Sequence, residues 1–443
     1  MPMTLRATST ETGVRIDDHP VPRGEVAKTL GPLVRMLVDD APVSFEFWDG
    51  STYGPSRAIA NIRLRSKDAL RRLFWSPGEL GIARAFVSGD VIIDGDLIET
   101  LRALRSGGKN IRRGLPLVPR IAASAARLGV IGRPLSPPAE EIKPRGIRHS
   151  LTRDAKVVGH HYDVGNDFYR LVLGQSMTYS CAYFTAPTDS LAEAQESKYD
   201  LVCRKLGLHE RTEMRLLDVG CGWGSMALHA ASRYRACVVG VTISKEQFKA
   251  ATERVKEAGL SDRVEIRLED YRQLAGERFD AISSIGMFEH VGKSRIGDYF
   301  TTLSSLLSPK GRLLNHAISS IGGSKLGRRS FMYRYVFPDG ELLDVGETVL
   351  AVEAVGFEVR DVESLREHYA LTLRQWVANL EEHWDDAVKL VGVGRARVWR
   401  LYMAGSVVGF EDGGLGIHQV LGVLPESDGT SGMPRTRNKW VTT

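Results

Sequence analysis

The stretch Leu217–Gly224 reads L-D-V-G-C-G-W-G and decides the expected fold. The apolar run Met214–Val219 leads into it and predicts a β-strand, while the helical spacing of Met226–Tyr234 follows it. The three glycines permit a tight turn and let the backbone approach a ligand closely. The stretch therefore predicts a ligand-binding loop between a strand and a helix.

Apolar runs and helical segments alternate on both sides of this loop. The expected further strands are Cys237–Ile243, Val264–Leu268, Phe279–Ile285 and Arg312–Ile318. The expected helices are Leu191–Leu206, Lys245–Ala258 and Arg295–Leu307. Continuous apolar strands separated by helices predict an α/β fold, a doubly wound Rossmann-like sheet with both faces covered.

Two features separate the glycine loop from a nicotinamide-binding loop. The spacing G-x-G-x-x-G requires glycine where the chain has Ser225, and no acid stands about 20 residues further on. The form D-x-G-x-G-x-G suits S-adenosylmethionine (SAM), whose carboxylate a helix N-terminus favours. Asp218 can orient the loop or accept a hydrogen bond from the SAM ammonium. Taken alone, the loop also fits a structural turn.

The ends of the next two strands supply further candidates for a SAM site. Most SAM methyltransferases hold the ribose with an acid after the second strand, but here the candidates are Thr242 and Gln247. After the third strand, Asp270 and Tyr271 offer an acid and an aromatic edge for adenine. These positions predict one cofactor site along the carboxyl edge of the sheet.

The length of 443 residues suits more than one domain. We expect a smaller N-terminal α+β accessory domain at 1–105, a basic proline-containing linker at 106–150, a methyltransferase domain at 151–425 and a C-terminal tail at 426–443. In the accessory domain, Val43–Trp48 and Ile59–Arg65 alternate like strands, and Ser66–Phe74 is typical of a capped helix.

Neither a membrane span nor a metal site is expected. No apolar run reaches the roughly 18–20 residues that cross a bilayer, and residues 1–13 lack the apolar core of a signal peptide. These patterns predict a cytoplasmic protein. The four cysteines, Cys181, Cys203, Cys221 and Cys237, form no C-x-x-C pair and have no zinc-type spacing with histidine.

The segment 101–150 is strongly basic, with eleven Lys and Arg against two acids. Such a segment can bind nucleic acid, anionic lipid or only solvent. Within it, Val118–Val130 is typical of a short basic helix that lies on a membrane surface. The aromatic interleaving that base stacking requires is absent from this segment, which argues against a nucleic-acid partner.

Several motifs, in one order over about residues 150–410, resemble the cyclopropane fatty-acyl-phospholipid synthases and the related mycolic-acid methyltransferases. Besides the glycine loop, they are His161–Tyr169, Met177–Phe184, Gly240–Ser244, Gly286–Gly292, Arg334–Gly340 and His368–Leu373. By matching position, the resemblance implies that SAM contacts Tyr179, Ser180, Gly220, Gly222, Thr242, Gln247, Asp270 and Tyr271. It also implies a bicarbonate ion that acts as base, held by Cys181, Glu289, His316, Tyr369 and the backbone of Ile318.

The implied reaction transfers a methyl or methylene group to the cis double bond of an unsaturated acyl chain in a phospholipid. An isolated alkene is a weak nucleophile, and its attack on the SAM methyl leaves a carbocation. The site must exclude water and provide a base. The aromatic faces of Tyr183, Phe184 and Tyr335 are expected to stabilise the cation.

A phospholipid substrate favours anionic headgroups as partners of the basic segment, at about 1 kcal/mol per basic residue near the surface. We therefore expect peripheral association with the inner face of the membrane, and also a homo-oligomer. Alternative functions are a lipid-binding protein that only retains the SAM fold, and a methyltransferase acting on a small molecule or RNA.

The C-terminal end bears on the product. Val408–Leu421 and Ser431–Arg437 depart from the usual synthases and resemble the branch that makes the 10-methylene precursor of tuberculostearic acid. That product requires a separate reductase to saturate it. Ring closure to a cyclopropane is the alternative, since nearly the same residues serve both exits from the cation.

Overall fold

The computed structural model describes residues 24–38, 41–107, 118–142, 164–323, 327–338 and 340–438. The chain divides into two compact units. Unit 1 comprises Met1–Arg71 and Asp90–Pro134, and unit 2 comprises Arg72–Gly89 and Leu135–Thr443. Within the described residues, no helix is both long and apolar enough to cross a membrane.

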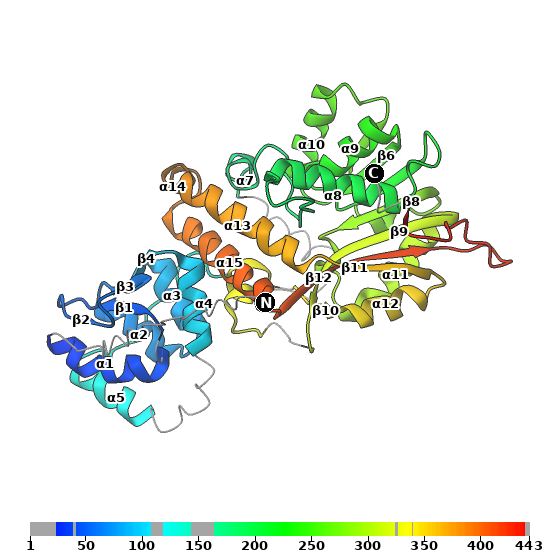
Figure 1. The fold of residues 1–443 in the computed structure, drawn as a ribbon. Helices are drawn as coiled ribbons and strands as arrows, with labels where there is room; N and C mark the ends of the chain where they lie inside the picture. Colours follow the sequence, from blue (N-terminus) through cyan, green and yellow to red (C-terminus); the bar gives the residue numbers. More distant parts are fainter. Residues whose placement is uncertain are drawn as a thin grey trace, which may run out of the picture. The chain divides into compact units, whose positions relative to one another are not determined.

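Unit 1 contains a four-stranded sheet in the order β2-β1-β3-β4 (Figure 1). Its strands are β1 (Val43–Glu46), β2 (Thr52–Tyr53), β3 (Ala60–Leu64) and β4 (Val91–Gly95). Its helices are α1 (Glu25–Val38), α4 (Leu97–Gly107) and α5 (Val118–Arg127), and α2 (Lys67–Trp75) crosses the unit boundary. Alternate residues of β1 and β3 are buried and pack with α1 in one core, as the alternation in the sequence predicted.

Unit 2 contains an eight-stranded sheet in the order β11-β12-β9-β8-β5-β6-β7, with β10 paired to β9. Its strands are β5 (Arg215–Val219), β6 (Cys237–Thr242), β7 (Val264–Leu268), β8 (Phe279–Ile285), β9 (Leu307–Ser320), β10 (Leu343–Asp344), β11 (Glu358–Ser364) and β12 (Leu415–Val423). The strands from β9 to β7 run parallel, whereas β12 is antiparallel to both β9 and β11. The predicted Rossmann-like α/β fold is confirmed, with an antiparallel pair added at one edge.

Helices cover both faces of this sheet (Figure 1). The helices of unit 2 are α3 (Glu79–Ser88), α7 (Asn166–Leu173), α8 (Leu191–Lys205), α9 (Ser225–Tyr234), α10 (Lys245–Glu257), α11 (Ile296–Leu306), α12 (Val345–Glu353), α13 (Arg366–Glu382), α14 (Trp384–Val391) and α15 (Val393–Glu411), of which α8, α9, α10, α11 and α12 pack on the sheet. Short helical turns are η3 (Tyr271–Gln273), η4 (Phe288–His290), η5 (Lys293–Arg295) and η6 (Met332–Val336). Adjacent residues Leu216 and Leu217 of β5 enter different cores, one with α8 and α9, the other with α11 and α12. The near-continuous apolar strands therefore reflect burial on both faces.

The two compact units differ from the domain ranges that we expected from the sequence. Helix α3 falls in unit 2, where the Arg84 guanidinium makes two hydrogen bonds to the Glu141 carboxylate and Glu79 Oε1 accepts from Phe331 N at 2.9 Å. The expected accessory domain at 1–105 is thus interrupted. Helix α5, expected inside the linker 106–150, falls in unit 1. These groupings depend on contacts between residues distant in the sequence, which local patterns do not contain.

Candidate active site

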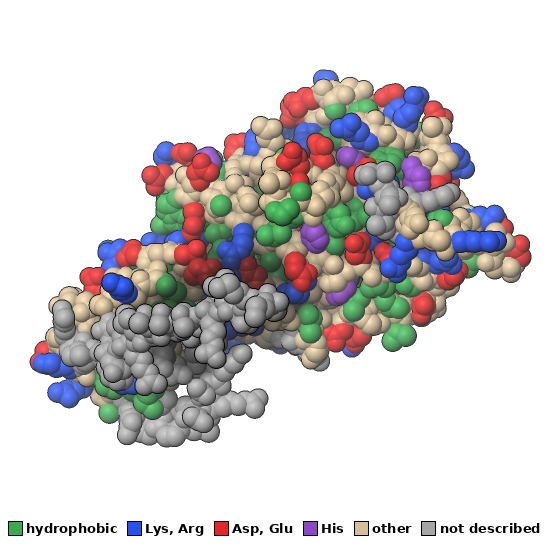
Figure 2. Space-filling model, in the orientation of Figure 1, with side chains coloured by type: hydrophobic (Ala, Val, Ile, Leu, Met, Phe, Trp, Pro, Cys, Tyr) green, Lys and Arg blue, Asp and Glu red, His purple; other side chains and the backbone are tan. Residues whose placement is uncertain are grey.

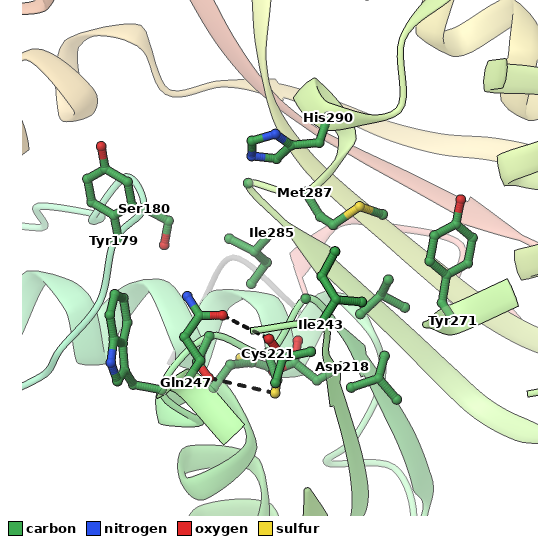
Figure 3. Close-up of a pocket in the computed structure, with 18 of the residues that line it drawn as sticks. Tyr179, Ser180, Asp218, Cys221, Ile243, Gln247, Tyr271, Ile285, Met287 and His290 are labelled. Atoms are coloured by element: carbon green, nitrogen blue, oxygen red, sulfur yellow. Dashed lines mark hydrogen bonds between the residues drawn. The ribbon is translucent and has the colours of Figure 1, made fainter. Parts of the chain in front are cut away.

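A cavity of about 220 Å³ opens at the carboxyl ends of β5, β6, β7 and β8. Ligands of open α/β sheets bind at this edge. All nine residues predicted to bind the cofactor line the cavity: Tyr179, Ser180, Asp218, Gly220, Gly222, Thr242, Gln247, Asp270 and Tyr271. Tyr179 and Ser180 lie on one side of it and Tyr271 on the other (Figure 3). The structure therefore brings the whole predicted set together.

The glycine loop makes a tight turn, and its residues line part of the cavity. Gly220 has φ +73°, and a Cβ there would approach Met287 Cγ to 2.9 Å. Gly222 has φ +55°, with open space where its Cβ would lie. Both conformations disfavour residues with a side chain. The loop leaves a glycine-lined cradle in front of the N-terminus of α9, which favours an anionic group.

Asp218 is the last residue but one of β5 and is buried. Its Oδ1 accepts a hydrogen bond from Ser283 Oγ at 2.8 Å, whereas no described group donates to Oδ2. Burial raises the pKa of this carboxyl to about 6. An ammonium group in the cavity would satisfy Oδ2, as the sequence predicted for SAM.

The candidates for the ribose and the adenine are held by local hydrogen bonds. Thr242 Oγ1 donates to Gln247 Oε1 at 2.8 Å and accepts from Ser244 N. Asp270 caps η3, and its carboxylate accepts from the Arg272 backbone and guanidinium. These contacts fix both groups against the cavity wall before any ligand enters.

The predicted catalytic residues lie outside the lining of this cavity, in a group next to it that we call the buried cluster. Cys181, His316 and Tyr369 are buried, and Glu289 and Ile318 are half-buried. Glu289 belongs to η4, between the cavity residues Met287 and His290. Its Oε1 accepts from Ile318 N of β9 at 2.7 Å, and no described group donates to its Oε2. Burial raises the Glu289 pKa to about 7. This carboxyl group therefore exchanges a proton near neutral pH.

His316 also lies on β9, two residues before Ile318, and it is 1% exposed. Burial is the main cause that lowers its pKa well below the usual range, so the ring is neutral. Gln419 Nε2, on the paired strand β12, lies 3.2 Å from His316 Nδ1. The ring's other nitrogen, Nε2, is buried without a partner among the described residues.

Hydrogen bonds connect Cys181 and Tyr369 to the same region. Cys181 Sγ donates to Leu365 O at 3.7 Å, and Tyr369 N donates to that carbonyl at 3.1 Å. Leu365 N in turn donates to Ile417 O, and Ile417 pairs with Ile318. Both Cys181 and Tyr369 are buried, and burial raises the pKa of the Cys181 thiol. The thiol is therefore a neutral hydrogen-bonding group.

The donor and acceptor set fits both groups that the resemblance implies. For SAM, the glycine cradle and the unpartnered Asp218 Oδ2 offer places for a nucleoside with a zwitterionic tail. For bicarbonate, the unpartnered Glu289 Oε2 and His316 Nε2 are two buried atoms that need hydrogen-bond partners. Ile318 N already donates to Glu289, so this backbone group is shared.

Several residues at the site had not been identified from the sequence. Lys198 lines the cavity, Gln419 contacts His316, and the Tyr179 hydroxyl donates to that of Tyr402 at 2.9 Å. Lys198 carried a weak signal, because a lysine among the apolar positions of a helix is unusual. Gln419 carried none, since its partner is 103 positions away.

The structure gives the surroundings of the aromatic residues expected to stabilise a cation. Tyr183 and Phe184 stack on His368, and the Tyr335 hydroxyl donates to Glu141. Tyr179 has its own group of aromatic neighbours, namely Tyr169, Trp376, Trp399 and Tyr402. The predicted motif residues 161–163 lie outside the described residues.

Residues 149–420 match the family described as mycolic acid cyclopropane synthetase. A probable fatty acid methyltransferase of Mycobacterium tuberculosis is 44% identical over 404 residues, covering 89% of this chain and 93% of the relative. The tuberculostearic acid methyltransferase UfaA1 of the same species is 32% identical over 418 residues, covering 90% and 92%. The crystal structure of the mycolic acid cyclopropane synthase CmaA1 with SAH and CTAB aligns with a TM-score of 0.57. In that alignment identity is 34%, and coverage is 61% of this chain and 98% of the other.

Proposed function

The chain belongs to the mycolic acid cyclopropane synthetase family of SAM-dependent methyltransferases, and from this premise we propose that it methylates the cis double bond of unsaturated acyl chains in phospholipids. The observation that carries the proposal is the buried cluster of Glu289, His316, Ile318, Cys181 and Tyr369. A methyltransferase acting on a nitrogen or oxygen needs only to accept a proton from a heteroatom. Here a proton must leave carbon, which demands a sequestered base.

SAM supplies an electrophilic methyl group to the reaction. The glycine loop, Thr242 and Gln247 hold the nucleoside along the sheet edge. The alkene carbon forms a bond to the methyl carbon as the sulfur–methyl bond breaks, and the adjacent alkene carbon becomes cationic. We propose that Tyr179 and its aromatic neighbours, which form one group of rings, stabilise that charge with their faces.

A bicarbonate ion bound at the cluster supplies the base. Cys181, Tyr369, His316 and Ile318 N would hold it by hydrogen bonds, and Glu289 Oε2 would accept its proton. Burial keeps His316 neutral, so the ring adds no positive charge next to the cation. The buried cluster also excludes water, which would otherwise capture the cation as an alcohol.

For the product we propose the 10-methylene acyl chain. It forms when a 1,2-hydride shift moves the cation and a proton then leaves the former methyl group. The match to UfaA1 over 90% of this chain supports this product. A separate reductase would saturate the methylene group. Direct proton loss with ring closure would give a cyclopropane, which the family description and the resemblance to CmaA1 favour.

Incubation with methyl-labelled SAM and dioleoyl phospholipid tests the reaction and the product together. We expect label in the acyl chain, a mass gain of one CH₂ unit, and vinylidene proton signals in the NMR spectrum. High-field cyclopropane protons would contradict the methylene product while keeping the reaction. Label in RNA but not in lipid would contradict the acyl substrate.

We also propose that the basic segment 101–150 binds anionic headgroups. Arg112 and Arg113 lie outside the described residues, and Arg120 lies in α5. Acidic and basic side chains are interspersed over the rest of the surface that is visible in Figure 2. This distribution favours a localised basic site over attraction of the whole protein to anionic lipid. Binding to vesicles with anionic lipid should weaken with added salt. It should also weaken when Arg112, Arg113 and Arg120 are replaced by Gln, and binding unaffected by either change would contradict this proposal.

A further inference from the structure

Lys198 is a buried lysine inside the cofactor cavity. It lies on α8, is 1% exposed and lines the cavity together with Asp218. Its Nζ donates to Ser180 Oγ at 3.0 Å and lies 4.1 Å from the centre of the Tyr199 ring. Among the described residues, no carboxylate lies within ion-pair distance of this ammonium group. Such a group is costly to bury without a counter-charge.

Lys205, two turns further along the same helix, shows how the chain otherwise compensates a buried lysine. It is also 1% exposed, but its Nζ lies 2.9 Å from Asp361 and 2.5 Å from Glu363. Two lysines on one helix are thus equally buried, and among the described residues only Lys205 has carboxylates within ion-pair distance. The difference indicates that the counter-charge of Lys198 comes from a ligand.

The contact with Ser180 does not by itself explain a charged side chain. Gln195 Nε2, one turn earlier on α8, donates to Ser180 O at 2.9 Å. Tyr183 N donates to Ala194 O at 2.9 Å. Hydrogen bonds between neutral groups therefore already attach the segment from Ser180 to Tyr183 to α8. The Ser180 hydroxyl could accept from a neutral donor, so it does not require an ammonium group.

Within the cavity, Lys198 and Asp218 form a pair of opposite charges that are near enough to interact but not hydrogen-bonded. Each shifts the pKa of the other toward its charged form, although burial, the larger effect, lowers the Lys198 pKa to about 7 and raises the Asp218 pKa to about 6. A ligand end with both a carboxylate and an ammonium would match this pair. The methionine part of SAM is such an end.

We propose that Lys198 Nζ and the Ser180 hydroxyl bind the carboxylate of SAM, while Asp218 Oδ2 accepts from its ammonium. This assignment rests on SAM-dependent methyl transfer and not on the acyl substrate or the product. Lys198 then acts as a specificity residue, because adenosine thioethers without the carboxylate leave the buried ammonium uncompensated.

Two ligands that differ only in this carboxylate test the assignment. Isothermal titration calorimetry compares S-adenosylhomocysteine with its decarboxylated analogue, 5′-(3-aminopropylthio)-5′-deoxyadenosine. We expect the wild-type protein to bind the first at least about 30-fold more tightly, the range for breaking a buried charge pair. In Lys198→Met the ratio should fall by about 10-fold or more, with the Ser180 hydroxyl left as a partner of the carboxylate. Lys249→Met, an exposed position on α10, should keep the wild-type ratio.

Thermal unfolding of the ligand-free variants separates ligand binding from a structural role. Lys198→Met should unfold at the same or a higher temperature, because it removes an uncompensated buried charge. Lys205→Met should unfold at a lower temperature, because Glu363 then loses its cation and Asp361 keeps only Arg437. A wild-type ratio near one, or a preserved ratio in Lys198→Met, would overturn the proposal. The wild-type ratio decides the question even if the variant does not fold, and lipid methylation does not enter the measurement.

Discussion

The cofactor cavity and the buried cluster next to it are built in opposite ways. The cavity takes most of its lining from short contiguous stretches at successive strand ends, and this lining combines polar groups with a larger apolar surface. The cluster takes four side chains and one backbone group from four places in the sequence, held through β9, β12 and the start of α13. The cavity leaves Asp218 Oδ2 open to a ligand, and the cluster leaves Glu289 Oε2 and His316 Nε2. The first region is suited to binding and the second to chemistry.

The substitution Glu289→Gln should have the largest effect of those proposed, and it should change catalysis at the buried cluster without changing ligand binding in the cavity. Loss of the proton acceptor should lower the rate roughly 10²- to 10⁴-fold, while S-adenosylhomocysteine binding stays within about 2-fold because the cavity lining is unchanged. Methyl transfer to oleoyl phospholipid and calorimetry measure the two effects. Glu353→Gln, at an exposed position on α12, is the matched control. Near-normal turnover in Glu289→Gln would refute the assigned role.

The pH dependence of stability should sharpen the same contrast. Burial raises the Glu289 pKa from 4.5 to about 7, so the unfolded chain ionises first as the pH rises. Wild-type stability relative to Glu289→Gln should therefore fall between pH 4.5 and about 7 and level off above, by on the order of 3 kcal/mol in total. Denaturant unfolding of both proteins from pH 4 to 9 measures this. A constant difference would show that the carboxylate is solvated. Methyl transfer should rise over the same interval, since only the ionised group accepts a proton.

The smallest effect is expected from replacing one of two glycines by Ala, where only one of the two positions lines the cavity. Gly222 and Gly259 both have positive φ, +55° and +68°, with open space where a Cβ would lie. Replacement of either by Ala should cost about 1–2 kcal/mol of stability from backbone strain. Only Gly222→Ala should also weaken S-adenosylhomocysteine binding, by about 10-fold or more, because Gly222 lines the cavity. Equal ligand affinities in the two variants would contradict the assigned role of the loop.

Local patterns were sufficient for the part of the cofactor region at the strand ends, whereas Tyr179 and Ser180 were expected only from the family resemblance. The loop Leu217–Gly224 follows a buried strand and precedes a helix, and the parallel register places the next strand ends beside it. Thr242, Gln247, Asp270 and Tyr271 therefore line the same cavity as the glycines. Each of these positions could be inferred because the carboxyl ends of parallel strands lie at one edge.

The catalytic cluster could be predicted only through the family resemblance. Nothing local relates Cys181 to Leu365, or His316 to Gln419, because their proximity depends on the antiparallel pairing of β12 with β9. The segment Val408–Leu421, which departs from the usual synthases, includes residues of β12, and one of them, Gln419, contacts His316. The segment is therefore part of the site's framework as well as a difference from the usual synthases.

The sequence by itself determined the Rossmann-like sheet and the position of the SAM loop, because these depend on periodicity and on glycine's backbone freedom. Its ordered motifs indicated the family by resemblance. The tertiary structure decided which buried polar groups have partners. Lys198 and Lys205 have the same residue type, helix and burial, yet only Lys205 meets Asp361 and Glu363. Whether a buried charge is compensated depends on residues distant in the chain, so only the folded protein distinguishes a structural lysine from one that awaits a ligand.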